Sequence, residues 1–542
     1  MALTDLPTDL PDGEYSIAVD SVDRTWNGDE HTTTAFTEVC AADAALTRTF
    51  SAPIDGGEFP DEPAEGGRYT ARIQDSDIVD ISLDWERSIR DAARSVPEDE
   101  LVLPLKRSTE LAPGALEMPT MATIARNKSL LVTGEPGAGK TEAIKLLLNQ
   151  ISADEDTPVV VFSYKDDYTD WAETRDDVVK LSTRDASHVH NIFEEIDSNG
   201  SEGEDEFDEM ADVLFKEHRA GSKNIFFPDA ASNLLSGLLR YLYREGKRAG
   251  LKPDNRELLD FVRRFSQEEA YELLSAEDGE GNSRYPDIQG AAGTITPKAR
   301  KQTAGVYTTL QLVLERTFGA GDLSRDASNG DTISIREYMK NPDGRILLLD
   351  YPIAEGSRVR PAFRFFLHRA IKFGLRDRTQ AYFVLDEFAR IPNVTNMEEL
   401  IDTGRARNAQ AILGLQSVSQ LDSEYGELTA DALRSGMLYE LHLRSGDRRT
   451  VAYGRFRLGG GSELIKHGRT SDGADYPDQS SMGPAETAVL QDLKDGEGFL
   501  ITPNGRARVR LPMYADLRQD TRRVLKTRGS ARSTSAEPNR HH

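Results

Sequence analysis

Short apolar runs alternate with amphipathic stretches through the central and C-terminal parts of the chain. The runs cover residues 129–133, 158–162, 345–350, 381–386 and 410–415. After the first run, the apolar positions of residues 142–149 recur every three or four residues, as in a helix that buries one face. Continuous apolar strands that alternate with helices are typical of a buried, mostly parallel sheet. The pattern therefore predicts an α/β core.

A different pattern interrupts this core after its second strand. The polar run 197–205 predicts a loop. After it, apolar residues recur at helical spacing in residues 231–242, 255–263 and 304–318. We therefore expect residues 195–325 to form an all-helical lobe, inserted between a first core segment, 101–194, and a second core segment, 326–515.

The two ends of the chain differ from the core. Residues 1–100 contain short alternating stretches, such as Tyr15–Asp20 and Arg68–Ile73, between clusters of Gly, Pro and Asp. This pattern predicts a small antiparallel β domain, whose role stays open. Residues 516–542 nearly lack apolar side chains and carry mainly arginine, which predicts a basic, disordered tail. Nucleic-acid contact and an inert end are the alternatives for this tail.

The balance of charge affects which partners are compatible with the chain. It has 542 residues, 66 Lys and Arg against 92 Asp and Glu, and a net charge of −26. An acidic, lysine-poor composition is what we expect of a protein from a halophilic organism. At molar salt the Debye length falls to about 3 Å, so local basic patches decide whether a phosphate backbone is bound. The net charge therefore does not exclude DNA.

The chain has one cysteine and no long apolar segment. Cys40 alone allows neither an intramolecular disulfide nor a cysteine-based metal site. No signal-peptide pattern and no run of about 18 apolar residues occurs. We expect a cytoplasmic chain without a membrane span of its own, which a partner could recruit to the inner face of the cell membrane.

The strongest chemical motif follows the first predicted strand. It consists of Gly134, Glu135, Pro136, Gly137, Ala138, Gly139, Lys140 and Thr141, and it has the spacing of a phosphate-binding loop. Its glycines leave backbone N–H groups free to wrap a phosphate, Lys140 would reach the β and γ phosphates, and Thr141 would ligate Mg²⁺. A chance match is expected about 0.01 times in such a chain. The motif predicts ATP and Mg²⁺ as ligands.

A second motif ends the predicted strand 381–386. Asp386 would hold Mg²⁺ through its water shell, and Glu387 would act as the base that polarises the attacking water. Two acids after a strand can also be simple surface charge. Together with the phosphate-binding loop, however, they predict a site for ATP hydrolysis.

Three further segments carry a resemblance to a known family. They are Leu385–Pro392, Gly404–Ala409, and Leu415–Leu421 followed by Tyr425-Gly426. In this order and spacing they resemble the type IV secretion coupling proteins of the TraD/TraG family, which are related to the FtsK and HerA translocases. The resemblance covers residues 120–505. It implies a RecA-like P-loop core with an all-helical domain, a hexameric ring, and ATP-driven DNA translocation in conjugation, with a relaxase or secretion-channel proteins as partners.

The resemblance also implies roles for two more residues. Gln416 matches the sensor that reads the γ phosphate; a helix-capping glutamine is the alternative. Arg405, 19 positions after Asp386, matches the arginine finger that reaches the site of the neighbouring subunit. Arg407 is a competing candidate, and a surface ion pair is the structural alternative for either arginine.

The chain departs from the family pattern in two places. Coupling proteins usually begin with transmembrane helices, whereas this chain begins with the predicted β domain. Ser163 stands where the family often has Asp at the end of the second strand. Two rivals keep the same hydrolysis residues, namely a HerA-like repair helicase and a viral DNA-packaging ATPase. A rival of another class is an ATP-dependent oligomeric switch that translocates nothing.

Overall fold

The computed structural model describes most of the chain between residues 100 and 517. Backbone and side chains are described for residues 100–103, 124–152, 154–164, 167–196, 203–278, 280–325, 331–377, 380–391, 394–458, 490–503, 505–506, 508–512, 514 and 517. The backbone alone is described for residues 13–26, 31–41, 49–55, 68–74, 77–83, 104, 121–123, 467–469, 475–477 and 507. The predicted basic tail, from residue 518 onward, lies outside the described residues.

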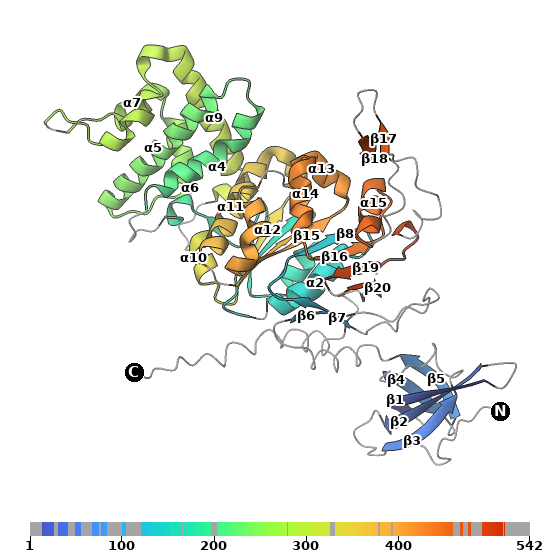
Figure 1. The fold of residues 1–542 in the computed structure, drawn as a ribbon. Coiled ribbons are helices and arrows are strands. Elements are labelled where there is room, and N and C mark those ends of the chain that lie inside the picture. Colours follow the sequence, from blue (N-terminus) through green and yellow to red (C-terminus); the bar gives the residue numbers. More distant parts are fainter. Residues whose placement is uncertain are drawn as a thin grey trace, which may run out of the picture.

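A nine-stranded sheet forms the centre of the protein (Figure 1). Its order is β10 (Val178–Leu181), β13 (Ile346–Tyr351), β9 (Val159–Tyr164), β14 (Ala381–Leu385), β15 (Ala409–Leu415), β8 (Leu130–Thr133), β16 (Tyr439–Leu443), β19 (Glu497–Thr502) and β20 (Gly505–Arg510). The seven strands from β10 to β16 run parallel; β19 pairs antiparallel with β16, and β20 pairs antiparallel with β19. The predicted α/β core with a mostly parallel sheet is confirmed.

Successive side chains of these strands enter two separate cores, one on each face of the sheet. On one face, Leu131, Val160 and Phe383 pack with α10 (Ile335–Lys340), α11 (Arg360–Asp377), α12 (Met397–Thr403), α13 (Val418–Tyr425) and α14 (Glu427–Ser435). On the other face, Leu130 and Val159 pack with α2 (Lys140–Ile151), α3 (Thr169–Glu173) and the hairpin β6 (Glu100–Pro104) to β7 (Met121–Ala125). Burial on both faces explains why the strand sequences are continuously apolar rather than alternating.

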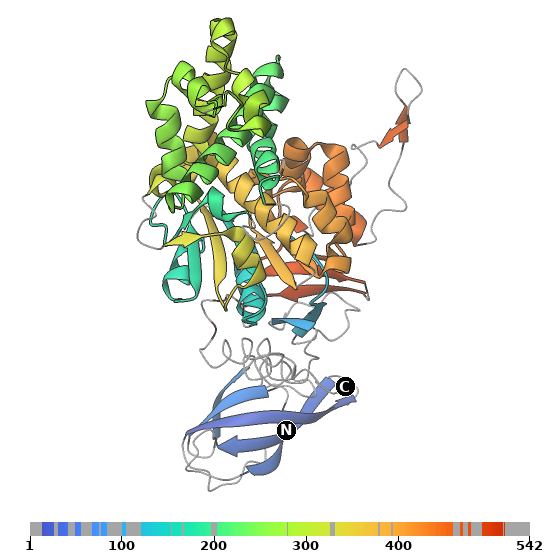
Figure 2. The same ribbon diagram turned by 90° about the vertical axis from the view of Figure 1, so that its left-hand side faces the viewer.

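The predicted helical insertion is present, and it extends from one end of the sheet (Figures 1 and 2). Its helices are α4 (Glu206–Gly221), α5 (Phe226–Ala249), α6 (Asn255–Arg264), α7 (Gln267–Leu274), α8 (Gln289–Gly293) and α9 (Arg300–Thr317). The short parallel strands β11 (Val189–His190) and β12 (Thr332–Ile333) close its base. Local sequence sets its boundaries: Asp254 and Ser266 begin α6 and α7 with capping boxes, and Gly250 ends α5 in a left-handed conformation.

A buried ionic network joins this lobe to the core. Arg369 of α11 is fully buried and donates from Nε to Glu195 Oε2 at 3.1 Å and from Nη1 to Glu206 Oε2 at 2.6 Å. Glu195 also lies 3.2 Å from His190 Nε2 and accepts from the backbone N–H of Ile335 at 2.6 Å. Buried charges are tolerated only when they are paired and hydrogen-bonded, as they are here.

The remaining elements lie at the two ends of the chain. The predicted antiparallel β unit is a five-stranded sheet in the order β3-β2-β1-β4-β5, formed by β1 (Gly13–Trp26), β2 (His31–Ala41), β3 (Thr49–Asp55), β4 (Arg68–Gln74) and β5 (Asp77–Leu83). Toward the C-terminus follow α15 (Arg448–Arg457) and the pair β17 (His467–Arg469) and β18 (Asp475–Pro477). Within the described residues, no helix has the length and apolar character that crossing a membrane requires.

Candidate functional site

The carboxyl ends of three neighbouring strands bring most of the predicted site residues together. The phosphate-binding loop, Gly134–Thr141, follows β8, Gln416 follows β15, and Asp386 and Glu387 follow β14. Because β15 lies between β8 and β14 in a parallel sheet, the three segments meet at the carboxyl-terminal ends of these strands. The backbone N–H of Gly134 donates to Leu415 O at 3.0 Å, which fixes the beginning of the loop beside β15.

The loop has the open backbone that a bound phosphate requires. Gly137 and Gly139 have φ values of 82° and 101°, in the region that side chains disfavour. A Cβ atom on Gly137 would have no neighbour within 4 Å, and one on Gly139 would lie 3.3 Å from Gly496 Cα. Pro136 is exposed, whereas Ala138 is buried and its carbonyl accepts from the N–H of Gly496 at 3.0 Å. Gly139 precedes α2, so the loop leads directly into a helix N-terminus.

Lys140 joins the loop to the two acids that follow β14. Its buried Nζ donates to Asp386 Oδ1 at 2.7 Å and to Glu387 Oε1 at 2.7 Å. Burial alone would lower the pKa of Lys140, but the two carboxylates outweigh burial and raise it. The ammonium group therefore stays charged, and two carboxylates that are themselves buried balance it.

Asp386 is the common acceptor of the site. Besides Lys140, it accepts from Thr141 Oγ1 at 2.8 Å, from the Tyr168 hydroxyl at 3.4 Å and from the backbone N–H of Glu387 at 3.0 Å. Burial and the negative charge of Asp386 raise the pKa of Tyr168 well above its usual value, so the hydroxyl stays protonated and can donate. A Cβ atom on Gly414 of β15 would lie 2.3 Å from Asp386 Oδ1, so only glycine leaves room for this carboxylate.

Glu387 is held in a costly arrangement. Its φ and ψ of 57° and 41° are left-handed, which costs a non-glycine residue about 1–3 kcal/mol. Its side chain is buried, and Oε2 has no hydrogen-bond partner among the described residues. Backbone strain and unsatisfied buried acceptors both concentrate at functional sites. Glu387 therefore has a free carboxylate oxygen available for a reacting molecule.

The flanks of the loop are tied to β16, which neighbours β8 on the other side. Glu135 accepts from Arg444 Nε at 2.6 Å and from the N–H of Gly446 at 3.0 Å. Thr133, one residue before the loop, lies with Oγ1 2.8 Å from His442 Nδ1. Glu135 is thus a structural anchor of the loop, in addition to its place in the motif.

Gln416 lies beside the loop in a half-buried position. Its Oε1 accepts from Gln420 Nε2 at 3.1 Å, one turn into α13. Ser417, not Gln416, caps α13, because Ser417 is the N-cap residue and its side chain accepts from the N–H of Gln420. The capping alternative for Gln416 is therefore wrong.

Arg405 lies at the opposite end of the sheet, where the strands begin. It belongs to the short turn Gly404–Arg407, which precedes β15, whereas the phosphate-binding loop follows the carboxyl ends of the strands. The seven residues of β15 separate these ends by about 20 Å. Arg405 is exposed, and within the described part of the chain it has no ion pair. Partial burial and the charge of Arg405 lower the pKa of Lys128, which lies at the same end.

Sequence reasoning missed three contributors to this site. Tyr168 and Gly414 contact Asp386, and Arg444 holds Glu135. Arg444 comes directly after β16, and Tyr168 follows β9, so both lie near the carboxyl ends of parallel strands, where ligands usually bind. Their position after predicted or parallel strands could therefore have marked Arg444 and Tyr168 as candidates. The close approach of Gly414 depends on strand pairing and had no signal in the sequence.

Comparisons with known proteins agree with this geometry. The sequence family described as the type IV secretion-system coupling protein DNA-binding domain matches residues 116–512. A search of curated proteins finds no match. Among solved structures, the chain is similar to the bacterial conjugative coupling protein TrwBdeltaN70 in an unbound form, with 18% identity, a TM-score of 0.52, and coverage of 79% of this chain and 91% of that one.

Two nucleotide complexes of the plasmid coupling protein TrwB are similar to the same extent. The complex with a non-hydrolysable ATP analogue has 17% identity and a TM-score of 0.51 over 79% of this chain and 92% of that one. The complex with ADP and Mg²⁺ has 19% identity and a TM-score of 0.50 over 75% and 89%. At these identities the likeness shows a shared fold, and the family match carries the assignment of relationship.

Proposed function

Because the chain belongs to the family of type IV secretion-system coupling proteins, we propose that it is an ATPase that couples ATP hydrolysis to the movement of DNA in conjugative transfer. The resemblance seen in the sequence is confirmed by the family match over residues 116–512. One observation carries the enzymatic part of the proposal: Lys140 of a phosphate-binding loop pairs with both Asp386 and a strained, partly unsatisfied Glu387.

The residues present fit ATP and Mg²⁺. The open backbone at Gly137 and the helix N-terminus after Gly139 suit the negative charge of phosphate groups. In the described parts of the chain no cluster of three or more His, Cys, Asp or Glu side chains is placed to hold a metal ion. Mg²⁺ needs no such cluster, because it is commonly held by one or two carboxylates together with substrate phosphates. The complexes of TrwB with ADP and Mg²⁺ and with an ATP analogue support the same ligands here.

The side chains would divide the chemistry as follows. Lys140 exchanges its two ion pairs for contacts with phosphate oxygens, which leaves Asp386 and Thr141 to orient the metal ion. When bound there, Mg²⁺ would supply positive charge to offset the negative charge that develops on the transferred phosphoryl group. Glu387, released from Lys140, accepts a proton from the attacking water through its carboxylate. Gln416, beside the loop, is placed to report the γ phosphate to α13.

Arg405 supports a ring of identical subunits. At about 20 Å from its own phosphate-binding loop, along β15, its guanidinium group cannot act in the site of its own chain. It is exposed, as a group that serves a neighbouring copy must be. We therefore propose that Arg405 completes the site of the next subunit, and that the ring is hexameric. Arg407, from the same turn, remains the competing candidate.

DNA is the proposed substrate, and a relaxase or secretion-channel protein the proposed partner. The description of the matched family as a DNA-binding domain supports DNA, and its place among type IV secretion-system coupling proteins favours conjugation over the HerA-like repair helicase and the viral packaging motor. Recruitment to the inner face of the cell membrane by such a partner belongs to the same proposal.

ATP turnover with and without DNA tests this function. Purified protein, in a series of KCl concentrations, should hydrolyse ATP faster when single-stranded or duplex DNA is added, and Glu387→Gln should abolish both rates. Turnover that DNA leaves unchanged at every salt concentration would contradict DNA translocation and favour the oligomeric switch.

A further inference from the structure

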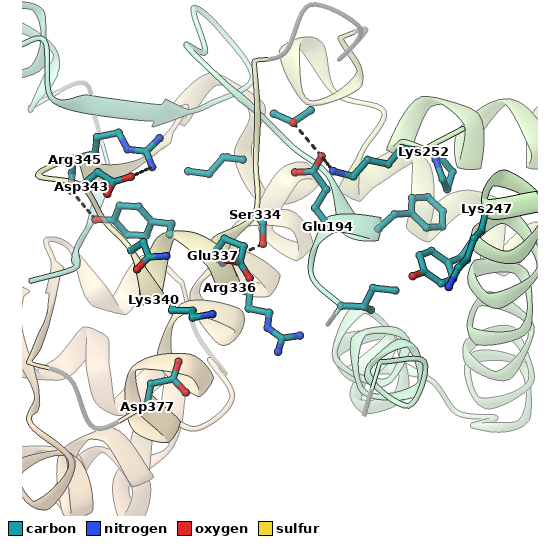
Figure 3. Close-up of a pocket in the computed structure, with 18 of the residues that line it drawn as sticks. Glu194, Lys247, Lys252, Ser334, Arg336, Glu337, Lys340, Asp343, Arg345 and Asp377 are labelled. Atoms are coloured by element: carbon teal, nitrogen blue, oxygen red, sulfur yellow. Dashed lines mark hydrogen bonds and ion pairs between the residues drawn. The ribbon is translucent and has the colours of Figure 1, made fainter. Parts of the chain in front are cut away.

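A large cavity lies near the amino-terminal ends of β13 and β14, at the end of the sheet away from the phosphate-binding loop. Figure 3 shows the residues that line it. Its volume is about 1190 Å³. One wall comes from the helical lobe, through the end of α5 at Lys247 and the following Lys252, and the other from the core, through α10, Arg345 before β13 and the end of α11. Pockets that enclose small molecules usually have volumes of about 300–1,000 Å³, so the volume of this cavity is larger than a drug-sized ligand requires.

The lining is basic, although the protein is strongly acidic. Six cations line the cavity, namely Lys247, Lys252, Arg336, Lys340, Arg345 and Arg376, against the four acids Glu194, Glu337, Asp343 and Asp377. Only 17 lysines occur in the chain, whose net charge is −26, and three of them are here. The sign of the local charge is therefore opposite to that of the whole molecule.

Ion pairs within the lining neutralise three of the four acids. Lys252 Nζ lies 2.7 Å from Glu194 Oε1, Arg345 Nη2 lies 3.4 Å from Asp343 Oδ2, and Arg376 Nε lies 3.0 Å from Asp377 Oδ1. Lys247 and Lys340 take no part in these pairs. Positive charge is thus left over after the internal pairs are formed.

The two unpaired lysines face the cavity from different elements. Lys247 and Lys340 are exposed, and neither forms an ion pair with any residue that the structure describes. Figure 3 shows Lys247 on α5 and Lys340, with Arg336, on α10 across the open space. The Arg336 guanidinium lies 5.7 Å from the centre of the Phe373 ring, which holds it against α11.

We propose that this cavity binds the phosphate backbone of DNA, with Lys247 and Lys340 each contacting a phosphate; the proposal rests on the proposed function as a DNA motor. Lysine ammonium groups on flexible stems act as point charges and suit contacts that do not depend on base sequence. A strand bound here would touch the helical lobe and the core together. All of the lining residues fall within the segment that matches the DNA-binding family.

Paired lysine variants of the full chain test the site. Lys247→Ala/Lys340→Ala removes the two proposed contacts, and Lys223→Ala/Lys301→Ala removes two exposed lysines of the helical lobe that lie outside the cavity lining. Fluorescence anisotropy of labelled single-stranded and duplex oligonucleotides would be measured over a series of KCl concentrations. Turnover without DNA, thermal melting and sedimentation would be recorded for each variant.

The cavity variant should bind DNA more weakly than the unmodified protein, and its binding should depend less steeply on salt concentration. Each lost phosphate contact lowers the slope of log K against log salt by about 0.9 on duplex and about 0.7 on single-stranded DNA, so two contacts lower it by about 1.8 or about 1.4. The control pair should keep the slope of the unmodified protein. Turnover without DNA should not change in either variant, because these lysines lie outside the hydrolysis site.

Four results would overturn the proposal. An unchanged slope in the cavity variant, or an equal loss in the control pair, would do so while leaving the proposed function intact, provided that the unmodified protein still binds DNA and is stimulated by it. A loss of binding that accompanies loss of assembly would assign the cavity to contact between copies of the chain. An unmodified protein that binds no DNA would remove both this site and the proposed function.

Discussion

Asp386 shows how much of the site depends on a single carboxylate. It accepts hydrogen bonds from Lys140, Thr141, Tyr168 and the backbone N–H of Glu387. A side chain in the role proposed for Asp386, holding a metal ion, needs this support, because an error of about 1 Å in position can cost a factor of about 100 in rate. Gly414 contributes as well, because its lack of a side chain leaves room for the Asp386 carboxylate.

Gly414→Ala should therefore damage hydrolysis without touching the phosphate-binding loop. The new methyl group would lie 2.3 Å from Asp386 Oδ1 and 3.2 Å from Asp386 Cα, so the carboxylate must move. We expect kcat to fall by about 100-fold and the Mg²⁺ concentration for half-maximal rate to rise. Steady-state turnover over a Mg²⁺ series measures both. Gly290→Ala is the control, because a Cβ atom there has no neighbour within 4 Å, and equal activity of the two variants would contradict this role.

The sequence predicted the residues of the site better than their conformations. Lys140, Thr141 and Asp386 are found by motif spacing, because a phosphate-binding loop and a strand that ends in acids have local signatures. The left-handed backbone of Glu387 and the need for glycine at 414 arise only when β14 and β15 pair. Contacts between strands distant in sequence leave no local pattern to read.

Among the helices and strands, too, those with a local sequence pattern were predicted, and those that depend on distant contacts were missed. The five apolar strands were predicted, but β16 was missed because its apolar positions alternate with Glu440 and His442. Both polar side chains are buried and bond to each other at 2.8 Å, which a sequence does not reveal. The edge hairpin β19–β20 and the outer strand β10 were also missed. Helix α4 was not picked out within the predicted lobe, although the acidic residues of its first turn are a helix-start signal.

The junction of the helical lobe and the core should depend on pH. Burial alone would raise the pKa of Glu195, but the hydrogen bond with His190 and the charge of Arg369 outweigh burial and lower the pKa to about 2. A carboxylate with a lowered pKa stabilises the fold fully above its unfolded value of about 4.3. This stabilisation is lost as the pH falls from there toward 2.

Glu195→Gln tests this junction. At pH 7 the variant should lose about 3 kcal/mol in the free energy of unfolding, because Arg369 keeps only part of its buried partners. The difference from the unmodified protein should shrink between pH 4.3 and pH 2. Urea unfolding followed by circular dichroism measures it, with the exposed Glu272→Gln as control. A difference that is the same at pH 7 and pH 3 would show that ionisation of Glu195 is irrelevant.

For the whole molecule, the two ends of the sheet, where its strands begin and where they finish, differ in the residues they present. The phosphate-binding loop occupies one end, and Arg405, together with Lys128, the other. If Arg405 acts as proposed, a single chain contains both halves of a hydrolysis site but cannot bring them together. The proposed ring would resolve this separation, because the amino-terminal end of the sheet in one copy would meet the carboxyl-terminal end in the next.

Mixing two inactive variants tests whether the site is shared. Arg405→Ala and Glu387→Gln should each lose turnover, and their mixture should regain part of it. The recovery is expected because some interfaces then combine Glu387 of one copy with Arg405 of the next. Turnover of the mixture is compared with that of each variant alone. Arg407→Ala mixed with Glu387→Gln is the matched control, and recovery in that mixture only would move the finger to Arg407.

The measurement that tests the central claim most directly is displacement of a triplex-forming strand from duplex DNA. A molecule that moves along DNA strips the third strand in proportion to ATP hydrolysed, whereas a switch that only binds and hydrolyses does not. We predict that the unmodified protein displaces the strand when ATP and Mg²⁺ are present, and that Glu387→Gln binds the same DNA without displacing it. Hydrolysis stimulated by duplex DNA but with the third strand left in place would contradict translocation along duplex DNA.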